Sequence, residues 1–289
     1  SQTRISPFAI VSSFVGMVSS ELSIHFGFRG PSHVMSTGCT SSTDAIGYAA
    51  SMVRNGTVKY AVAGGAEACI TPAVLTAFVQ MGTTATKWNH DPERASRPFN
   101  LDRDGFVLSE GAWMLILETL ENAIARNAKI YAEIAGYGST CDAYHKVQIM
   151  PGGAESARAI RIAVEAAGLT PQEVEYINLH GTATKINDEL ETLAIKNVFD
   201  GRSHRIPASS TKSMIGHPQG ACGAAGIVAT CMALEQGIIH PTINLENPDP
   251  ACDLDYVPNT SRQVSIQTAL CNTIAFGSKN SAIVLKKIR

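Results

Sequence analysis

Apolar residues recur along the chain in two patterns, one with the spacing of a helix and one as short continuous or alternating runs. The helical spacing predicts helices over residues 7–27 (ending at Gly27), 40–56, 154–167, 188–199 and 219–236. The short runs predict strands over residues 33–36, 60–64, 113–117, 130–137, 176–179, 206–209, 241–245, 269–275 and 282–286. Strands that alternate with helices after residue 129 predict a largely parallel α/β sheet covered on both faces.

The predicted strands are unevenly distributed. The first half of the chain offers only two or three of them, whereas the second half, from residue 129, supplies five or six. A first sheet with so few strands looks incomplete. The stretch 82–109 is rich in Asn, Asp, Pro and Arg, and irregular segments of this length in a compact domain are usually functional loops, lids or interfaces.

Composition fits a globular protein with a sizeable core, since 45% of the 289 residues are hydrophobic and 17% are charged. A net charge of −2 supplies no field to attract nucleic acid or an anionic membrane. No apolar run reaches the ~18 residues of a spanning helix. The seven cysteines are scattered without a C-x-x-C pair, so we expect neither a disulfide framework nor a zinc site, and we expect a reducing, cytoplasmic location.

One cysteine differs from the other six in its local setting. Cys39 follows Gly38 where a short apolar run gives way to a helical pattern. A thiol in the first turn of a helix feels aligned N–H dipoles, which favour the thiolate, and glycine permits a tight turn there. We expect the remaining cysteines to be small buried hydrophobic residues.

Two histidines downstream lie in similar turn-like settings. His180 ends an apolar strand and precedes Gly181, while His217 stands between Gly216 and Pro218. A lone histidine is more often a satisfied polar residue than a functional one. A nucleophilic thiol with two candidate bases nevertheless makes acyl transfer the leading hypothesis.

Three charged residues accompany these histidines. Lys212 lies five positions before His217, and Asp188 and Glu191 share one face of the helix that follows His180. Two interpretations are open: the carboxylates tether Lys212 in an ion-pair network, or they are ordinary surface charges.

Several motifs, in this order along the whole chain, resemble one family. They are Thr37-Gly-Cys-Thr-Ser-Ser42, Ala95-Ser-Arg-Pro-Phe-Asn100, Asp104-Gly-Phe-Val-Leu-Ser-Glu-Gly-Ala112, Asp142-Ala-Tyr-His145, His180-Gly-Thr-Ala-Thr184, Thr211-Lys-Ser-Met-Ile-Gly-His217, Cys252-Asp-Leu-Asp-Tyr-Val-Pro258 and Cys271-Asn-Thr-Ile-Ala-Phe-Gly277. The chain thereby resembles the β-ketoacyl-acyl carrier protein synthases. The resemblance implies a thiolase fold, an α/β architecture with α-β-α-β-α layers. It also implies that residues 1–128 are the remainder of an N-terminal half with the nucleophile, and residues 129–289 a C-terminal half with both histidines.

The resemblance also assigns roles to individual residues. Cys39 matches the nucleophile that accepts an acyl chain, and His180 and His217 match the pair that drives decarboxylation of malonyl-carrier protein. Lys212 matches a lysine that supports the histidines, with Glu191 as its partner and Asp188 nearby. Phe276 matches a gating aromatic residue, and its backbone N–H, with that of Cys39, would form an oxyanion hole. No metal or other cofactor is implied.

The strings Ser36-Thr-Gly-Cys-Thr40 and Thr184-Lys-Ile-Asn-Asp-Glu-Leu-Glu-Thr192 resemble the ketosynthase subunit of bacterial type II polyketide synthases in particular. The alternatives are a fatty-acid elongating synthase II, a non-catalytic chain-length partner subunit and a Cys-His hydrolase. The family's partners would be acyl carrier protein and a second chain, either identical or like a chain-length factor.

Two departures from the family pattern stand out. The final loop usually reads Phe-Gly-Phe-Gly-Gly-Thr-Asn, whereas this chain has Ile274-Ala-Phe-Gly-Ser-Lys-Asn280, which puts gate motion in doubt. Roughly the first third of a family member has no counterpart before Ser1. We therefore expect the first half-fold to be incomplete and its remainder to come from an N-terminal portion of the same fold.

Overall fold

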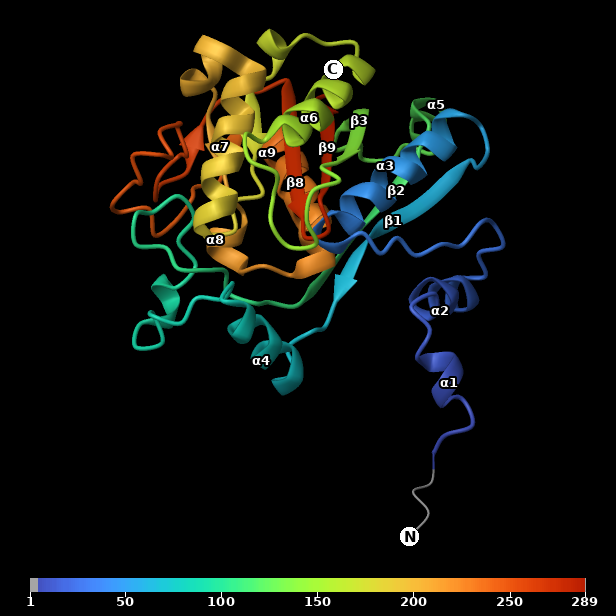
Figure 1. Ribbon diagram of the computed structural model, residues 1–289. Helices are drawn as coiled ribbons and strands as arrows, with labels where there is room; N and C mark the ends of the chain where they lie inside the picture. The colour runs from blue at the N-terminus through green and yellow to red at the C-terminus, as the bar shows by residue number, and fades with distance from the viewer. Residues whose placement is uncertain (1–4, 289) are drawn as a thin grey trace. The chain divides into compact units, whose positions relative to one another are not determined.

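The computed structural model describes residues 5–288, which belong to two compact units that divide between Ser36 and Thr37 (Figure 1). The first unit contains two short helices, α1 (Ala9–Ser12) and α2 (Met17–Phe26), neither of which has a buried residue. The single helix predicted over 7–27 is therefore two helices. The second ends as predicted, because Gly27 caps it in the left-handed conformation with φ 69°.

The strand predicted over 33–36 is wrong. These residues have no ladder partner among the strands that the structure describes. An apolar run becomes a strand only where a neighbouring strand offers hydrogen bonds, and sequence periodicity does not report the neighbour.

The larger unit is built on a five-stranded sheet with the order β3-β9-β8-β4-β5. Its strands are β3 (Glu133–Cys141), β4 (Tyr176–Asn178), β5 (Ala208–Ser209), β8 (Thr268–Ala275) and β9 (Lys279–Lys286). Only β4 pairs in parallel, with β5 and β8; the pairings β8–β9 and β3–β9 are antiparallel. The largely parallel sheet predicted from the sequence is thus corrected to a mixed one, because a short turn joins β8 directly to β9.

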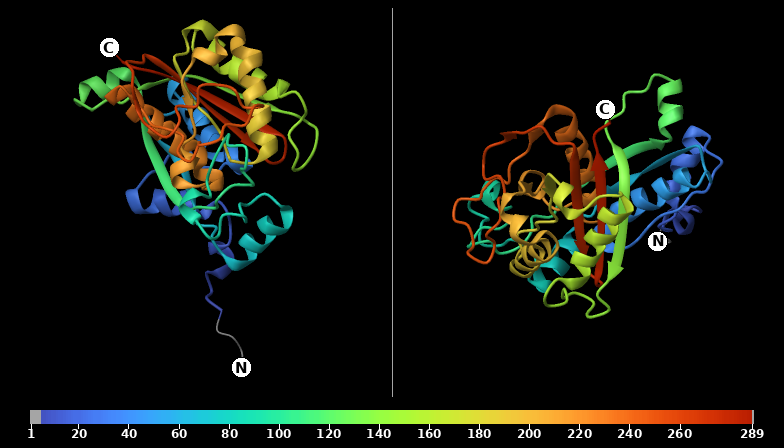
Figure 2. Two further views of the ribbon diagram at one scale, coloured as in Figure 1. Left: turned by 90° about the vertical axis from the view of Figure 1, so that its left-hand side faces the viewer. Right: turned by 90° about the horizontal axis from the view of Figure 1, so that it is seen from above.

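Helices cover both faces of this sheet, as predicted (Figure 2). Alternate residues of β9 explain the layers, since Ala282 and Val284 belong to one apolar cluster and Ile283 and Leu285 to another. The first cluster includes side chains of α6 (Ala154–Ala166) and α7 (Lys185–Phe199). The second includes side chains of α3 (Ser41–Arg54) and α9 (Cys222–Gln236).

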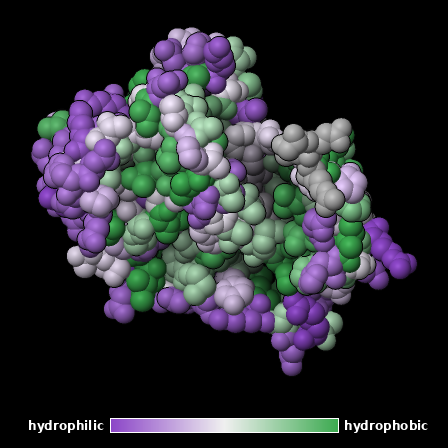
Figure 3. All heavy atoms as spheres, turned by 90° about the horizontal axis from the view of Figure 1, so that it is seen from below, coloured by the Kyte–Doolittle hydropathy of each residue, from purple (hydrophilic) through white to green (hydrophobic). Residues whose placement is uncertain are grey.

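A second sheet pairs β1 (Tyr60–Glu67) with β2 (Gly111–Glu118) in antiparallel register. Side chains of its inner face join the cluster of α3 and α9. On its other face Val62, Met114 and Ile116 remain 44%, 45% and 68% exposed. The layered α/β arrangement and the two-stranded first sheet confirm a thiolase-type fold with an incomplete first half. Apolar side chains are also exposed on the face seen in Figure 3. The division of the chain into halves at 128/129 stays a prediction.

The remaining helices and strands are short or were not predicted from the sequence. Helix α4 (Pro72–Met81) was not predicted, although its signals are present: Thr71 caps it and Pro72 opens it. Helices α5 (Leu120–Ala125) and α8 (Lys212–Ile215) and strands β6 (Ile238–Ile239) and β7 (Arg262–Gln263) complete the set. The strand predicted over 241–245 is wrong, because the chain turns at Asn244, where φ is 63°.

The stretch 82–109 is irregular as predicted, apart from one 3-10 turn at Pro92–Arg94. Of the helices that the structure describes, none combines the length and apolarity needed to span a lipid bilayer.

Packing of α3 against β3 generates a first prediction. A Cβ added to Gly47 would lie 2.4 Å from the ring of Tyr137. Gly47→Ala should therefore lower the free energy of unfolding by about 1–3 kcal/mol, since the ring and helix must separate. Gly201→Ala is the matched control, because nothing lies within 4 Å of its added Cβ. Urea denaturation measures both, and equal stabilities of the two variants would contradict the described packing.

Candidate active site

Cys39 lies in a 3-10 turn (Gly38–Thr40) that leads directly into α3. The preceding Gly38 has φ +70°, and a Cβ there would lie 3.3 Å from both Ala275 Cβ and the Phe276 carbonyl oxygen. Glycine is required at this position by its backbone conformation and by the close approach of the β8–β9 turn. Gly38 thus allows the turn that carries Cys39 to pack closely against the end of the central sheet.

The structure brings the three predicted reactive side chains together. The distance from Cys39 Sγ to His217 Nε2 is 3.2 Å. The rings of His180 and His217 are 5.4 Å apart and nearly perpendicular. All three side chains are buried, and one ligand atom from each lies within 4.8 Å of the others. Cys39 is at least 141 positions away from either histidine along the chain, yet the three residues share one site.

Lys212 supports His180 from behind. Its Nζ lies 2.6 Å from the backbone oxygen of His180 and 3.3 Å from Nδ1 of the same residue. An ammonium group only donates hydrogen bonds, so Nδ1 must accept and the ring proton resides on Nε2. The lysine therefore fixes the tautomer of His180.

Glu191 holds the strand end that carries His180. Its carboxylate accepts hydrogen bonds from the backbone N–H groups of His180 (2.7 Å) and Gly181 (2.8 Å) and from Asn272 Nδ2 (2.7 Å). Asn272 was not singled out from the sequence, although it lies within the quoted motif that begins at Cys271. Three donors, two from residues just after β4 and one from β8, thus meet at one buried side chain.

Asp188 forms its ion pair with Arg103 and not with Lys212, the partner that the sequence analysis considered. It accepts hydrogen bonds from the backbone N–H groups of Phe99 (2.8 Å) and Thr182 (3.1 Å), and it forms an ion pair with Arg103 at 3.3 Å. Neither Asp188 nor Glu191 forms an ion pair with Lys212 in the part of the chain that the structure describes. The proposed tether is corrected, because backbone donors and Arg103 already satisfy these carboxylates. Arg103, which sequence reasoning missed, comes from the long loop 82–109.

Burial controls the protonation of the site. It lowers the pKa of His180 and His217 well below the usual range of histidine, and the positive charge of Lys212 acts in the same direction. Both rings are therefore neutral at pH 7. Burial, followed by the neighbouring Cys222, raises the pKa of the Cys39 thiol, while Lys212 and the backbone N–H groups of Phe276 and Cys39 act against this shift. Burial therefore opposes the thiolate that the first turn of the helix was expected to favour.

The turn that carries Phe276 is fastened to a neighbouring loop. Ser278 Oγ donates a hydrogen bond to the His145 carbonyl oxygen (2.8 Å) and accepts one from the His145 N–H (3.2 Å). The Gly277 N–H donates to the Lys146 carbonyl oxygen at 2.9 Å. Ser278, one of the departures from the family pattern, therefore anchors the turn rather than leaving it free.

Thiolate and imidazole groups are zinc ligands, so Cys39, His180 and His217 have the chemistry of a three-ligand metal site. The buried ammonium of Lys212, beside His180, opposes a cation there.

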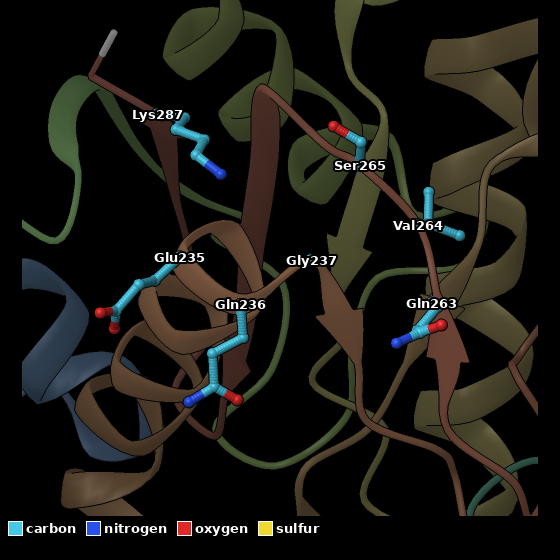
Figure 4. Close-up of a pocket in the computed structure, with 7 residues that line it drawn as sticks. All are labelled: Glu235, Gln236, Gly237, Gln263, Val264, Ser265 and Lys287. Carbon is cyan, nitrogen blue, oxygen red and sulfur yellow. The ribbon is translucent and has the colours of Figure 1, made fainter.

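A separate pocket lies at the C-terminal end of α9 and is lined by Glu235, Gln236, Gly237, Gln263, Val264, Ser265 and Lys287 (Figure 4). Helix rise places it about 20 Å along α9 from Cys222, which contacts the backbone of Cys39. This pocket is not part of the thiol site.

Burial raises the pKa of Glu191 to about 7, although the hydrogen bonds from Gly181, Asn272 and His180 act in the opposite direction, and this net shift generates a second prediction. The folded state retains a proton that the unfolded state releases near pH 4.3. The free energy of unfolding should therefore fall by about 3 kcal/mol as pH rises from about 4.3 to 7. Glu191→Gln should lack this slope, whereas Glu165→Gln on the exposed face of α6 should keep it. Chemical denaturation across this range measures the slopes, and identical ones for the wild type and Glu191→Gln would refute the assignment.

Comparison with known proteins agrees with this geometry. Residues 1–123 match the model of the β-ketoacyl synthase N-terminal domain, and residues 131–246 match that of the β-ketoacyl synthase C-terminal domain. The 3-oxoacyl-[acyl-carrier-protein] synthase 2 of Synechocystis is 47% identical over 285 residues, which are 99% of this chain and 68% of that protein. The putative polyketide β-ketoacyl synthase 1 of Streptomyces virginiae is 47% identical over 92% of this chain and 63% of its own length.

Solved structures give the same result. The ketosynthase of a type II polyketide synthase, in complex with its acyl-carrier protein and bound to a hexaketide, superimposes with a TM-score of 0.96 at 38% identity, covering 99% of this chain and 70% of that one. The ishigamide ketosynthase/chain length factor gives 0.91 at 33% identity, covering 99% and 68%. The motifs, the layered fold and the coverage of both domain models lead to one conclusion: this chain belongs to the β-ketoacyl synthase family, whose members are acyltransferases.

Proposed function

We propose that this chain catalyses a decarboxylative condensation in which an acyl group bound to Cys39 is joined to a malonyl unit carried by acyl carrier protein. The observation that carries the proposal is the contact of 3.2 Å between the Cys39 thiol and the neutral ring of His217, with a second neutral ring at its side. A thiol next to one base would serve acyl transfer alone. The second ring suits a reaction that also needs a positioned hydrogen-bond donor.

Acylation of the thiol is the first step. The sulfur of Cys39 attacks the carbonyl carbon of an acyl-carrier thioester, and its proton passes through His217 to the departing carrier thiolate. Nδ1 of His217 has no hydrogen-bond partner among the described residues. Neither tautomer of this ring is therefore fixed, and Nε2 is able to accept a proton in this step and to donate one in the next.

Decarboxylation and condensation follow. The Nε2–H of His180, fixed by Lys212, and that of His217 donate to the thioester oxygen of the malonyl unit, where negative charge develops as carbon dioxide leaves. The resulting carbanion attacks the Cys39 thioester. The N–H groups of Cys39 and Phe276 stabilise the tetrahedral oxyanion, each contributing about 2.7–4 kcal/mol if it resembles measured oxyanion-hole donors. Collapse of this intermediate releases the β-ketoacyl-carrier product and expels the thiolate of Cys39, which takes up a new proton from solvent water.

A third prediction tests this assignment. Cys39→Ala should abolish formation of the acyl-enzyme, because no other thiol lies against His217 in the described site. Intact-mass analysis after incubation with acyl-carrier protein should show one added acyl group on the wild type and none on the variant. Cys141→Ala, which alters an exposed cysteine, is the control and should still be acylated. Acylation of Cys39→Ala to the wild-type extent would remove the basis of the proposal.

For the pathway we propose the ketosynthase of a type II polyketide synthase, supported by the Ser36–Thr40 and Thr184–Thr192 strings and by the fit to the hexaketide-bound ketosynthase. The alternative is fatty-acid elongation, which the resemblance to 3-oxoacyl-[acyl-carrier-protein] synthase 2 supports. A non-catalytic partner subunit fits less well, because Cys39 and both histidines are present together. A Cys-His hydrolase would release free acid without any malonyl-carrier.

The proposed partners follow from the same family. They are acyl carrier protein, an N-terminal portion of the same fold and a second chain, either identical or like a chain-length factor. We also assign the enzyme to the cytoplasm and place residues 1–128 and 129–289 in its two halves.

The fourth prediction is that light scattering finds a twofold assembly at working concentration, with or without a co-expressed partner chain. A monomer under both conditions would contradict it.

A further inference from the structure

A polar side chain that the mechanism does not use lies beside the nucleophile. Gln219 follows His217 by two residues and begins the 3-10 turn (Gln219–Ala221) that leads into α9. Its Oε1 is 3.9 Å from Cys39 Sγ. Its Nε2 is buried and has no hydrogen-bond partner within residues 5–288. A buried N–H donor without a partner is rare and requires an explanation.

The backbone that carries this side chain is fixed by hydrogen bonds of its turn. Gln219 has φ +37°, in the left-handed region that residues other than glycine rarely adopt. The turn persists because the Ala221 N–H donates to the Pro218 carbonyl oxygen (2.8 Å) and the Gly220 N–H donates to Glu67 Oε2 (3.2 Å). Strained backbone of this kind is typical of functional sites. The side chain of Gln219 therefore extends from a fixed turn beside the thiol, with its Oε1 nearest the sulfur.

We propose that the Gln219 amide is a specificity-determining subsite that binds an oxygen at the β-carbon of the acyl chain on Cys39, so that β-oxo chains are accepted in preference to saturated ones. The inference rests on the proposed function, because it requires an acyl group on Cys39. The substrate class it selects is a β-ketoacyl thioester.

The positions of the other donors support this assignment. In the condensation, the N–H groups of Cys39 and Phe276 face the thioester oxygen, and the two histidines face the malonyl unit. A β-oxygen lies three bonds beyond the thioester carbon, and the proposed mechanism assigns none of these donors to it. The remaining donor is Gln219 Nε2. It is bonded to the same carbon as Oε1, which lies 3.9 Å from the sulfur.

Acylation itself changes the surroundings of Gln219. The thiol loses its proton when the thioester forms, so the long contact between Sγ and Oε1 ceases to be a hydrogen bond. The whole amide is then free to pair with the substrate. A saturated chain leaves it buried and unpaired, whereas a β-oxo chain satisfies its donor, and discrimination between substrates arises from this difference.

Gln219→Met tests the proposal, because it keeps the length of the side chain and removes the amide. The measurement is the second-order rate of Cys39 acylation, by intact mass, with acetoacetyl-carrier and butyryl-carrier protein, two chains of equal length that differ in one oxygen. The variant should lower the ratio of the acetoacetyl rate to the butyryl rate about tenfold relative to the wild type. Comparing ratios removes the intrinsic reactivity of each thioester.

Gln236→Met, at the exposed far end of α9, is the matched control and should keep the wild-type ratio (Figure 4). If Gln219→Met does not fold, as judged by circular dichroism, Gln219→Leu replaces it with the same expectation. An unchanged ratio with intact butyryl loading overturns the subsite but leaves the condensing function in place. Failure of the wild type to accept either chain overturns the proposed function and the subsite with it.

Discussion

The close approach of the Gly38 turn to the β8–β9 turn is the constraint on which the site depends. With no side chain at Gly38, the backbone of the nucleophile turn reaches the Phe276 carbonyl region of the central sheet. That approach places the Cys39 sulfur next to His217 and within reach of hydrogen bonds from the N–H groups of Cys39 and Phe276. A larger residue would separate two layers of the fold at the point where they have to meet.

A second set of contacts fixes the same junction from the side. Asp44, in the first turn of α3, accepts hydrogen bonds from Thr37 Oγ1 (2.5 Å) and Tyr137 OH (2.8 Å), and also from Ser281. The carboxylate therefore ties the residue two positions before Cys39 to strands β3 and β9. The reactive turn is held by polar groups from both sequence halves, which explains how distant segments keep a geometry that a thiol and an imidazole need.

Sequence periodicity predicted the helices and strands that depend on local pattern. It failed where pairing with a neighbouring segment determines whether a strand forms. Helix α9 and strands β8 and β9 bury apolar faces regularly, so their patterns are clear. The run 33–36 has the composition of a strand but lacks a described partner, and residues 241–245 turn at Asn244. The motifs located Cys39, His180, His217 and Lys212 at one site. They did not reveal that Glu191 binds backbone N–H groups or that Asp188 pairs with Arg103, because such contacts depend on distances across the fold.

The anchoring of Ser278 restricts the movement of the turn that carries Phe276. Because Ser278 and Gly277 are hydrogen-bonded to His145 and Lys146, the turn that carries Phe276 does not swing as an isolated hinge. Any displacement of the backbone of this turn has to break these bonds or carry residues 142–150 along with it. Movement of this turn is thus mechanically coupled to a surface loop more than 120 residues earlier in the chain.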